Sequence, residues 1–186
     1  MVVPSTRYRV ERQISDGVIE TWAALDETLD RPVTIRVAPL DSDAGQRLRL
    51  QARALARLEH SGLLHVLDTS SDDQRFAVIT ETLPTTTIAD ELYVKGNLAP
   101  LEAVGIAIEV GDALSVLHRA GFAHGGVTAA CIGRRENQHV VILDGPPTSD
   151  AVHIPATPPT DLRSLATLTH LMLVGHPPIT APDGHH

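Results

Sequence analysis

Lysine is almost missing from this sequence, in which Lys95 is the only one, so the other basic residues apart from the histidines are arginines. Cysteine is equally rare. Cys131 stands alone, which excludes an internal disulfide and favours a reducing compartment, most simply the cytosol. No apolar run approaches the roughly 18 residues of a membrane-spanning helix. The first residues also lack the charged and apolar regions of a signal peptide, so we expect a cytoplasmic protein without direct membrane insertion.

Basic residues are outnumbered by acidic ones. The 186 residues include 15 Lys and Arg against 23 Asp and Glu, which gives a formal charge of -8. This balance argues against a nucleic-acid partner and against binding to an anionic membrane surface. A chain of this length can bury one core, so a single domain with two lobes is the expected organisation.

The first half of the chain alternates apolar and charged residues with the period of half-buried strands. The predicted strands cover residues 8–14, 20–25, 31–38, 64–69 and 75–82. On the third strand Val33, Ile35 and Val37 would face the core, whereas Thr34 and Arg36 would face the other way. A helix is predicted over residues 44–59, with Asp43 as its N-cap.

The second half is predicted to be mainly helical. The expected helices cover residues 88–93, 100–118 and 162–174, and they end at Gly96, Gly121 and Gly175. Thr160-Asp161 is the expected cap of the last helix. The middle helix carries small and apolar residues at spacings of three and four, which predicts a buried central helix. That stripe consists of Val104, Ala107, Ile108, Gly111, Leu114, Ser115 and His118, and it is widened by Leu101, Val110, Ala113 and Leu117. A hairpin with strands over 130–133 and 139–143 would lead to Asp144.

Several stretches in this order resemble the catalytic core of bacterial serine/threonine protein kinases, of the actinobacterial type. They are ALDETLDRPVTIRVA at 24–38, HSGLL at 60–64, LHRAGFAH at 117–124, ILDG at 142–145 and DLRSL at 161–165. The resemblance implies an α+β, protein-kinase-like fold. An antiparallel sheet with the αC helix would form the small lobe, residues 7–83, and residues 84–180 a truncated, mainly helical large lobe. Residues 181–186 would be a tail, with the two final histidines typical of a tag remnant.

The residues that carry kinase chemistry in the family are largely replaced here. Gly126 stands at the position of the catalytic Asp, Thr128 at that of the loop Lys, and Cys131 at that of the Asn that holds the second magnesium. Arg36 replaces the phosphate-binding Lys, and Gln51 replaces the Glu that pairs with that Lys. The resemblance therefore implies a degenerate pseudokinase.

Two further kinase positions are only partly kept. Of the glycine-rich phosphate loop Gly17 alone remains, and Glu20 would place a carboxylate near the phosphates. Asp144 matches the metal-binding Asp, but Gly-Pro follows it in place of Phe-Gly. We expect no bound cofactor, neither ATP nor magnesium.

The alternative is a weak ATP-binding or residually active regulator. The resemblance then implies a nucleotide site that includes Gly17, Thr34, Arg36, Asp144, and Glu81 and Leu83 of the hinge segment, residues 81–84, whose backbone would meet the adenine edge. Asp144 would hold the metal ion.

Because the residues for phosphate transfer are replaced, we expect the chain to function by binding a protein partner. The resemblance to actinobacterial pseudokinases implies that an active serine/threonine kinase phosphorylates a threonine in the proline-rich segment, residues 146–160. A forkhead-associated domain would then bind the phosphate. The candidates are Thr148, Thr157 and Thr160, and such partners would recruit the chain to the cell envelope.

Two other kinds of chemistry have partial signals in this sequence. His124-Gly125-Gly126 resembles an esterase oxyanion element, but the chain has no Gly-x-Ser-x-Gly serine elbow to accompany it. The ten histidines are scattered and do not have metal-ligand spacing. We therefore expect His118 and His124 to be structural.

Overall fold

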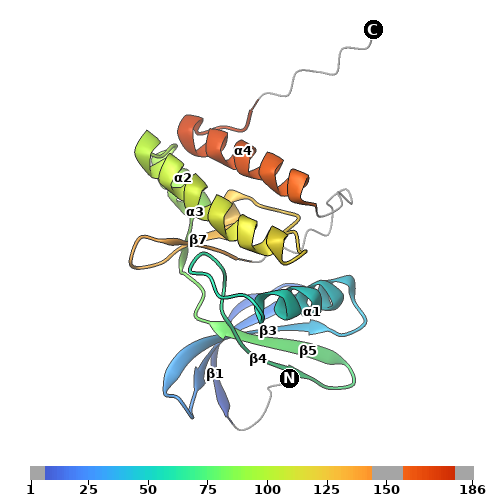
Figure 1. The fold of residues 1–186 in the computed structure, drawn as a ribbon. Coiled ribbons are helices and arrows are strands. Elements are labelled where there is room, and N and C mark those ends of the chain that lie inside the picture. Colours follow the sequence, from blue (N-terminus) through green and yellow to red (C-terminus); the bar gives the residue numbers. More distant parts are fainter. Residues whose placement is uncertain (1–6, 144–156, 179–186) are drawn as a thin grey trace. The chain divides into compact units, whose positions relative to one another are not determined.

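The structure is a computed structural model, and it describes residues 7–143 and 157–178 (Figure 1). These residues form two compact units, the first through Thr85 and the second from Thr86 onward. The first unit consists of β1 (Tyr8–Asp16), β2 (Glu20–Asp26), β3 (Arg31–Pro39), α1 (Asp43–Leu55), β4 (Val66–Ser71) and β5 (Arg75–Glu81). The second consists of β6 (Thr86–Thr87), α2 (Ile88–Lys95), α3 (Pro100–Arg119), a short 3₁₀ turn (Ala129–Cys131), β7 (Ile132–Arg134), β8 (Val140–Ile142) and α4 (Pro158–Val174).

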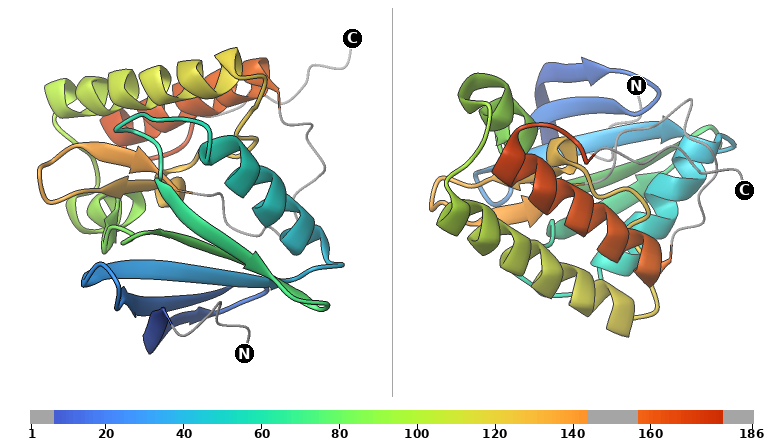
Figure 2. Two further views of the ribbon diagram at one scale, coloured as in Figure 1. Left: turned by 60° about the horizontal axis from the view of Figure 1, so that its bottom comes forward. Right: turned by 90° about the horizontal axis from the view of Figure 1, so that it is seen from above.

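The first unit is a five-stranded antiparallel sheet with the strand order β1-β2-β3-β5-β4. Its two faces bury different side chains. Val33, Ile35 and Val37 pack with Ala77 and Ile79 on one face, as the alternation predicts. The other face carries Ala38, Phe76 and Val78, and α1 covers it with Leu48 and Ala52 (Figure 2). The predicted strands and the core-facing side of β3 are confirmed.

The boundaries of α1 differ from the prediction at both ends. Ser42, and not Asp43, is the N-cap: its hydroxyl accepts the Gly45 N–H at 3.0 Å and donates to the Pro39 carbonyl at 2.7 Å. These two bonds join the helix directly to the end of β3. The helix also ends at Leu55 and not at Glu59, because the next residues close tighter turns: the Arg57 and Leu58 N–H groups donate three residues back.

The second unit places α3 and α4 side by side in antiparallel directions (Figure 2). One face of α3 is buried, and that face consists of Ala103, Ile106, Val110, Ala113, Leu114 and Leu117. The predicted stripe is therefore wrong in part, since Val104 is 46% and Ile108 60% exposed. Spacing alone cannot decide which of two apolar faces a helix buries. Here α4 contacts the predicted stripe only at its later members, such as Gly111 and His118.

Three shorter features of the second unit also differ from the predictions. Ala130 and Cys131 belong to the 3₁₀ turn, so β7 begins only at Ile132. The two-residue strand β6 was not predicted, and it pairs with β7 to make a three-stranded sheet. Helix α4 begins at Pro158 and not at Leu162, because prolines fit the first helical turn, where no N–H is needed.

Glycines end the three longer helices of the second unit. Gly121 lies just after α3 at φ +82°, the left-handed conformation that the sequence predicts there. Gly96 and Gly175, which follow α2 and α4, also have positive φ. In the described part of the chain, no helix combines the length and apolarity needed to cross a membrane.

Candidate functional site

A buried carboxylate organises the loop that follows α3. Asp161, in the first turn of α4, is fully buried. Its oxygens accept the backbone N–H groups of His124 and Gly125 at 2.8 and 2.7 Å, and Nε2 of His118 lies 2.8 Å from Oδ2. We call these contacts the Asp161 clamp. Through these contacts Asp161 joins the start of α4 to the backbone of the loop before β7 and to the end of α3.

Sequence reasoning missed the role of Asp161, which it assigned only to helix capping. The signal was the Asp-Leu-x-Ser-Leu motif, but its partners His118 and His124 lie 43 and 37 residues away. The prediction that these two histidines are structural agrees with their contacts. Nε2 of His124 lies 2.9 Å from the Leu143 carbonyl, so the ring also fixes the end of the hairpin.

Gly126 follows the clamp at the position of the family's catalytic Asp. Its backbone has ordinary φ, and a Cβ added there would meet nothing within 4 Å. Lack of space therefore does not explain why a carboxylate is missing from this position. Asp161 thus holds the backbone immediately before Gly126, and Gly126 itself contributes no side chain to the loop.

Cys131 is turned into the loop. Its Sγ donates to the Gly126 carbonyl at 3.2 Å and lies 3.1 Å from the Thr128 hydroxyl. The side chain is fully buried, and this burial raises the pKa of the thiol. A protonated, enclosed thiol is a poor metal ligand and a poor nucleophile, so here Cys131 closes the loop on itself.

The remaining kinase-like positions of the second unit are only partly described. Asp144, Thr148 and the tail at 181–186 lie outside the described residues. Thr157 and Thr160 form a capping box at the start of α4: the Thr157 hydroxyl accepts the Thr160 N–H, and the Thr160 hydroxyl donates to the Thr157 carbonyl at 2.7 Å. Both side chains are half-buried in this box.

Lys95 lies at the end of α2 and takes part in a charged network. Its Nζ is 2.8 Å from Glu91, which also pairs with Arg134, and Arg134 contacts Glu102 at 2.8 Å. The network joins α2, α3 and β7. The single lysine thus belongs to a partly exposed charged network.

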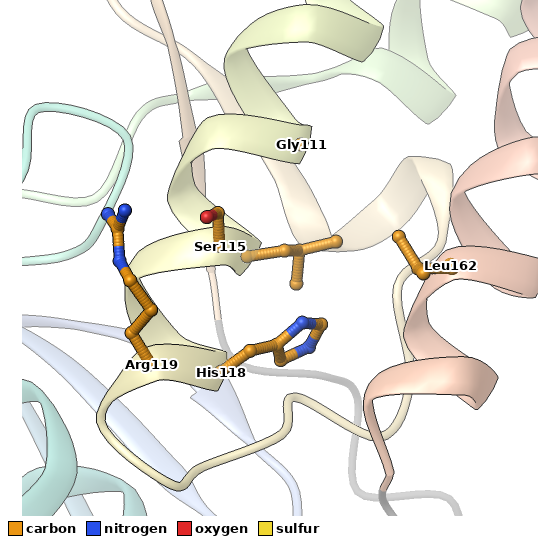
Figure 3. A pocket seen from close by; sticks show the side chains of 6 residues that line it. Gly111, Ser115, His118, Arg119 and Leu162 are labelled. Carbon is orange, nitrogen blue, oxygen red and sulfur yellow. The ribbon is translucent and has the colours of Figure 1, made fainter.

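A shallow pocket lies between α3 and α4 (Figure 3). It has a volume of about 410 Å³ and is lined by Gly111, Leu114, Ser115, His118, Arg119 and Leu162. The imidazole of His118 points toward α4, whereas the side chain of Arg119 runs away from it (Figure 3). The lining contains no carboxylate, and its histidine is committed to the Asp161 clamp.

In the first unit, Arg36 lies on β3 opposite Val78 of β5, and the side chain is 6% exposed. Alternation places it on the face that α1 covers. Burial lowers the pKa of the guanidinium to about 10, so the group remains a cation at neutral pH. Gln51 lies half-buried on α1.

The tip between β1 and β2 shows little of a phosphate-binding loop. A Cβ added to Gly17 would meet nothing closer than 3.7 Å, so this glycine is not required by crowding. Glu20 lies 3.0 Å from Arg75 of β5, which balances the carboxylate within the sheet.

The hinge segment is bonded to the sheet through its backbone. The Leu83 N–H donates to the Thr34 hydroxyl at 3.2 Å, and the Glu81 carbonyl accepts from the Thr80 hydroxyl at 2.9 Å. The Glu81 N–H donates to His65, whose own N–H donates to the Glu81 carboxylate, both at 3.0 Å. Thr34, Glu81 and Leu83, which the resemblance joins in one nucleotide site, thus lie together.

Among residues 7–143 and 157–178, no group of three or more His, Cys, Asp or Glu side chains is placed to hold a metal ion.

Comparison with known proteins relates the chain to bacterial kinases. No protein-family model matches it. It is 28% identical over 203 residues to the serine/threonine-protein kinase PknL of Mycobacterium tuberculosis, covering 94% of this chain and 51% of PknL. It is 28% identical over 151 residues to the probable serine/threonine-protein kinase PknB of Corynebacterium glutamicum, covering 76% of this chain and 23% of PknB. The serine/threonine-protein kinase PrkC of Bacillus subtilis is 26% identical over 125 residues, 64% of this chain and 19% of PrkC.

The chain is thus distantly homologous to bacterial serine/threonine protein kinases. The similarity extends over most of its length, and with the antiparallel sheet, α1 and the helices that follow it confirms the predicted protein-kinase-like α+β fold. The chain spans about half the length of PknL, 51%.

Proposed function

We propose that this chain is a pseudokinase, a kinase-like protein that transfers no phosphate and acts by binding a protein partner. The observation that carries the proposal is the loop from His124 to Cys131. Its frame is intact through the Asp161 clamp, while Gly126 offers no carboxylate and the Cys131 thiol is enclosed. Phosphotransfer needs a group that orients the substrate hydroxyl together with metal ligands and a cation on the phosphates. Such groups act as a unit, so losing two of them at once removes activity.

The partner-binding surface is proposed to be controlled by phosphorylation of Thr148, Thr157 or Thr160. Thr157 and Thr160 bond to each other in the first turn of α4, and Asp161 lies in the same turn. A kinase can reach either hydroxyl only if that turn unwinds. A phosphate of about -1.5 to -2 charge at the helix N-terminus would then favour the turn again through the helix dipole. Phosphorylation would thereby act on the Asp161 clamp.

The proposed partners are a forkhead-associated domain and the active serine/threonine kinase that modifies the chain, through which the chain would reach the cell envelope. To test this, the chain is phosphorylated with an active bacterial serine/threonine kinase, the phosphates are located by mass spectrometry, and binding of a forkhead-associated domain is measured by calorimetry. We expect binding only after phosphorylation.

The matched variants separate the switch from general damage. Thr157→Asn keeps an N-cap acceptor but cannot take phosphate, and it is combined with Thr148→Ala and Thr160→Ala. Thr167→Ala, an exposed position on α4, is the control. Binding should disappear in the triple variant and persist in the control. Phosphates found only at other residues, or equal binding by the triple variant, would remove the switch from the account.

A weak ATP-binding regulator is the second candidate. Arg36 favours it, because this side chain keeps a cation on the β3 face where the family places its lysine. Thermal unfolding with and without magnesium and ATP distinguishes the two, since a ligand that binds the folded state raises the melting temperature. We expect no rise.

A further inference from the structure

Two threonines lie opposite each other on neighbouring strands of the first unit. Thr34 of β3 and Thr80 of β5 are register partners, so their side chains leave the same face of the sheet. They are only 1% and 2% exposed. A buried hydroxyl requires a hydrogen-bond partner. Both hydroxyls find theirs in the hinge segment: Thr34 accepts the Leu83 N–H, and Thr80 donates to the Glu81 carbonyl.

These two backbone groups have the pattern that an adenine base would need. The Watson–Crick edge of adenine offers an amino donor beside a ring-nitrogen acceptor. A carbonyl at residue 81 and an N–H at residue 83 of one extended segment are complementary to that edge. In this chain both are already engaged by the chain's own hydroxyls.

We propose that Thr34, assisted by Thr80, closes this backbone edge to a purine base. The inference deepens the proposed function, on which it rests, because a closed base-binding edge explains how a kinase-like frame remains free of nucleotide. It names adenine as the excluded ligand class and Thr34 as the residue that excludes it. It concerns the base alone and requires no phosphate, metal ion or transfer step.

The two threonines are not equivalent. A backbone N–H makes one good hydrogen bond, so the Leu83 donor is unavailable while Thr34 holds it. A carbonyl has two lone pairs, so the Glu81 oxygen can accept a second donor while Thr80 is bound. The backbone at Glu81 is also held in its orientation, because both its N–H and its carboxylate are hydrogen-bonded to the backbone of His65. Thr34 should therefore control binding more strongly than Thr80.

The test uses adenosine without phosphate or magnesium, and measures binding by calorimetry to the whole chain. Thr34→Val replaces the hydroxyl by a methyl group of the same shape, and Thr34→Ala removes both. We expect adenosine to bind Thr34→Ala roughly tenfold tighter than the wild type, the scale of one regained hydrogen bond. Thr34→Val should gain less, because its methyl group still covers the Leu83 N–H. Thr80→Val should give a smaller gain, and Thr69→Val on β4, the control, should give none.

Inosine is the matched ligand, because its ring N–H and carbonyl reverse the donor and acceptor of adenine. It should bind no Thr34 variant better than the wild type. Equal adenosine binding by the wild type and folded Thr34→Ala would overturn the proposal. That result would leave the phosphotransfer prediction untouched, since adenosine carries no transferable group.

A measurement on the wild type keeps the inference testable if the variants fail to fold. The Leu83 amide should exchange its hydrogen slowly, because Thr34 holds it in a buried bond. Exchange as fast as that of an unstructured peptide would show that the edge is open, and would contradict the proposal.

Discussion

The two ends of the loop from His124 to Cys131 differ in what holds them. At the first end, backbone N–H groups are held by the buried carboxylate of Asp161. At the second end, the Cys131 thiol reaches back and donates to the carbonyl of Gly126, a residue without a side chain. A buried carboxylate therefore fixes the backbone at His124 and Gly125, whereas a thiol bonds the backbone at Gly126.

The first unit shows the same contrast. Asp26 is fully buried, accepts two bonds from Arg7 at 2.9 and 2.7 Å, and also accepts the Thr28 and Leu29 N–H groups. At the hinge, by comparison, the backbone is held by the neutral hydroxyls of Thr34 and Thr80. In both units the buried carboxylates that the structure describes have a structural role.

Asp161→Ala should have the largest effect on stability. It leaves the His124 and Gly125 N–H groups and His118 without their buried acceptor, so we expect a loss of about 3 kcal/mol in the free energy of unfolding. Asp161→Asn keeps one acceptor oxygen and should lose less. Urea unfolding measures both, with Asp112→Ala on the exposed side of α3 as control. A loss from Asp161→Ala no greater than from the control would show that the loop does not depend on the clamp.

Gly175→Ala should have the next largest effect. The residue ends α4 at φ +84°, and a Cβ there would lie 2.6 Å from the Gly96 oxygen. We expect a loss of about 2 kcal/mol from this strain. Gly105→Ala, inside α3 with open space around its Cβ, should instead gain about 0.5–1 kcal/mol. Equal effects of the two substitutions would contradict the described junction between α2 and α4.

Asp26 should give the smallest change, a loss of stability that appears as the pH falls into the acid range. The hydrogen bonds from Arg7 lower the pKa of its carboxyl from the ordinary 3.8 to about 2. Because the folded state holds the charged form, this stability is complete above the unfolded value and is lost as pH falls through about 2. Asp26→Asn should therefore flatten the fall in melting temperature between about pH 4 and 2, unlike Asp73→Asn at an exposed turn. Parallel acid profiles for wild type and Asp26→Asn would contradict the Arg7 contact.

The sequence predicted the features that depend on local pattern. Period-two alternation placed Val33, Ile35 and Val37 on one face of β3, and Gly121 predicted the left-handed end of α3. Features that depend on contacts between distant residues could not be predicted from the sequence. The Thr34 hydroxyl meets an N–H 49 residues away, and no local pattern distinguishes it from other strand threonines.

The buried faces of the helices could be predicted only in part. Spacing found the length of α3 but chose a stripe that includes the exposed Val104 and Ile108, because two apolar stripes run along the same helix. The buried stripe is fixed by the position of α4, which no local pattern reveals. The same holds for the start of α4 at Pro158, where the capping box with Thr157 replaced the expected cap at Thr160 and Asp161.

The central claim, that the loop is anchored but cannot transfer phosphate, is tested most directly by incubation of the intact chain with radiolabelled ATP, magnesium and a generic protein substrate. Asp144→Ala, at the position that the resemblance matches to a metal-binding Asp, is measured alongside. We predict that neither protein incorporates label into itself or the substrate above the protein-free background. Incorporation by the wild type that Asp144→Ala abolishes would contradict the account.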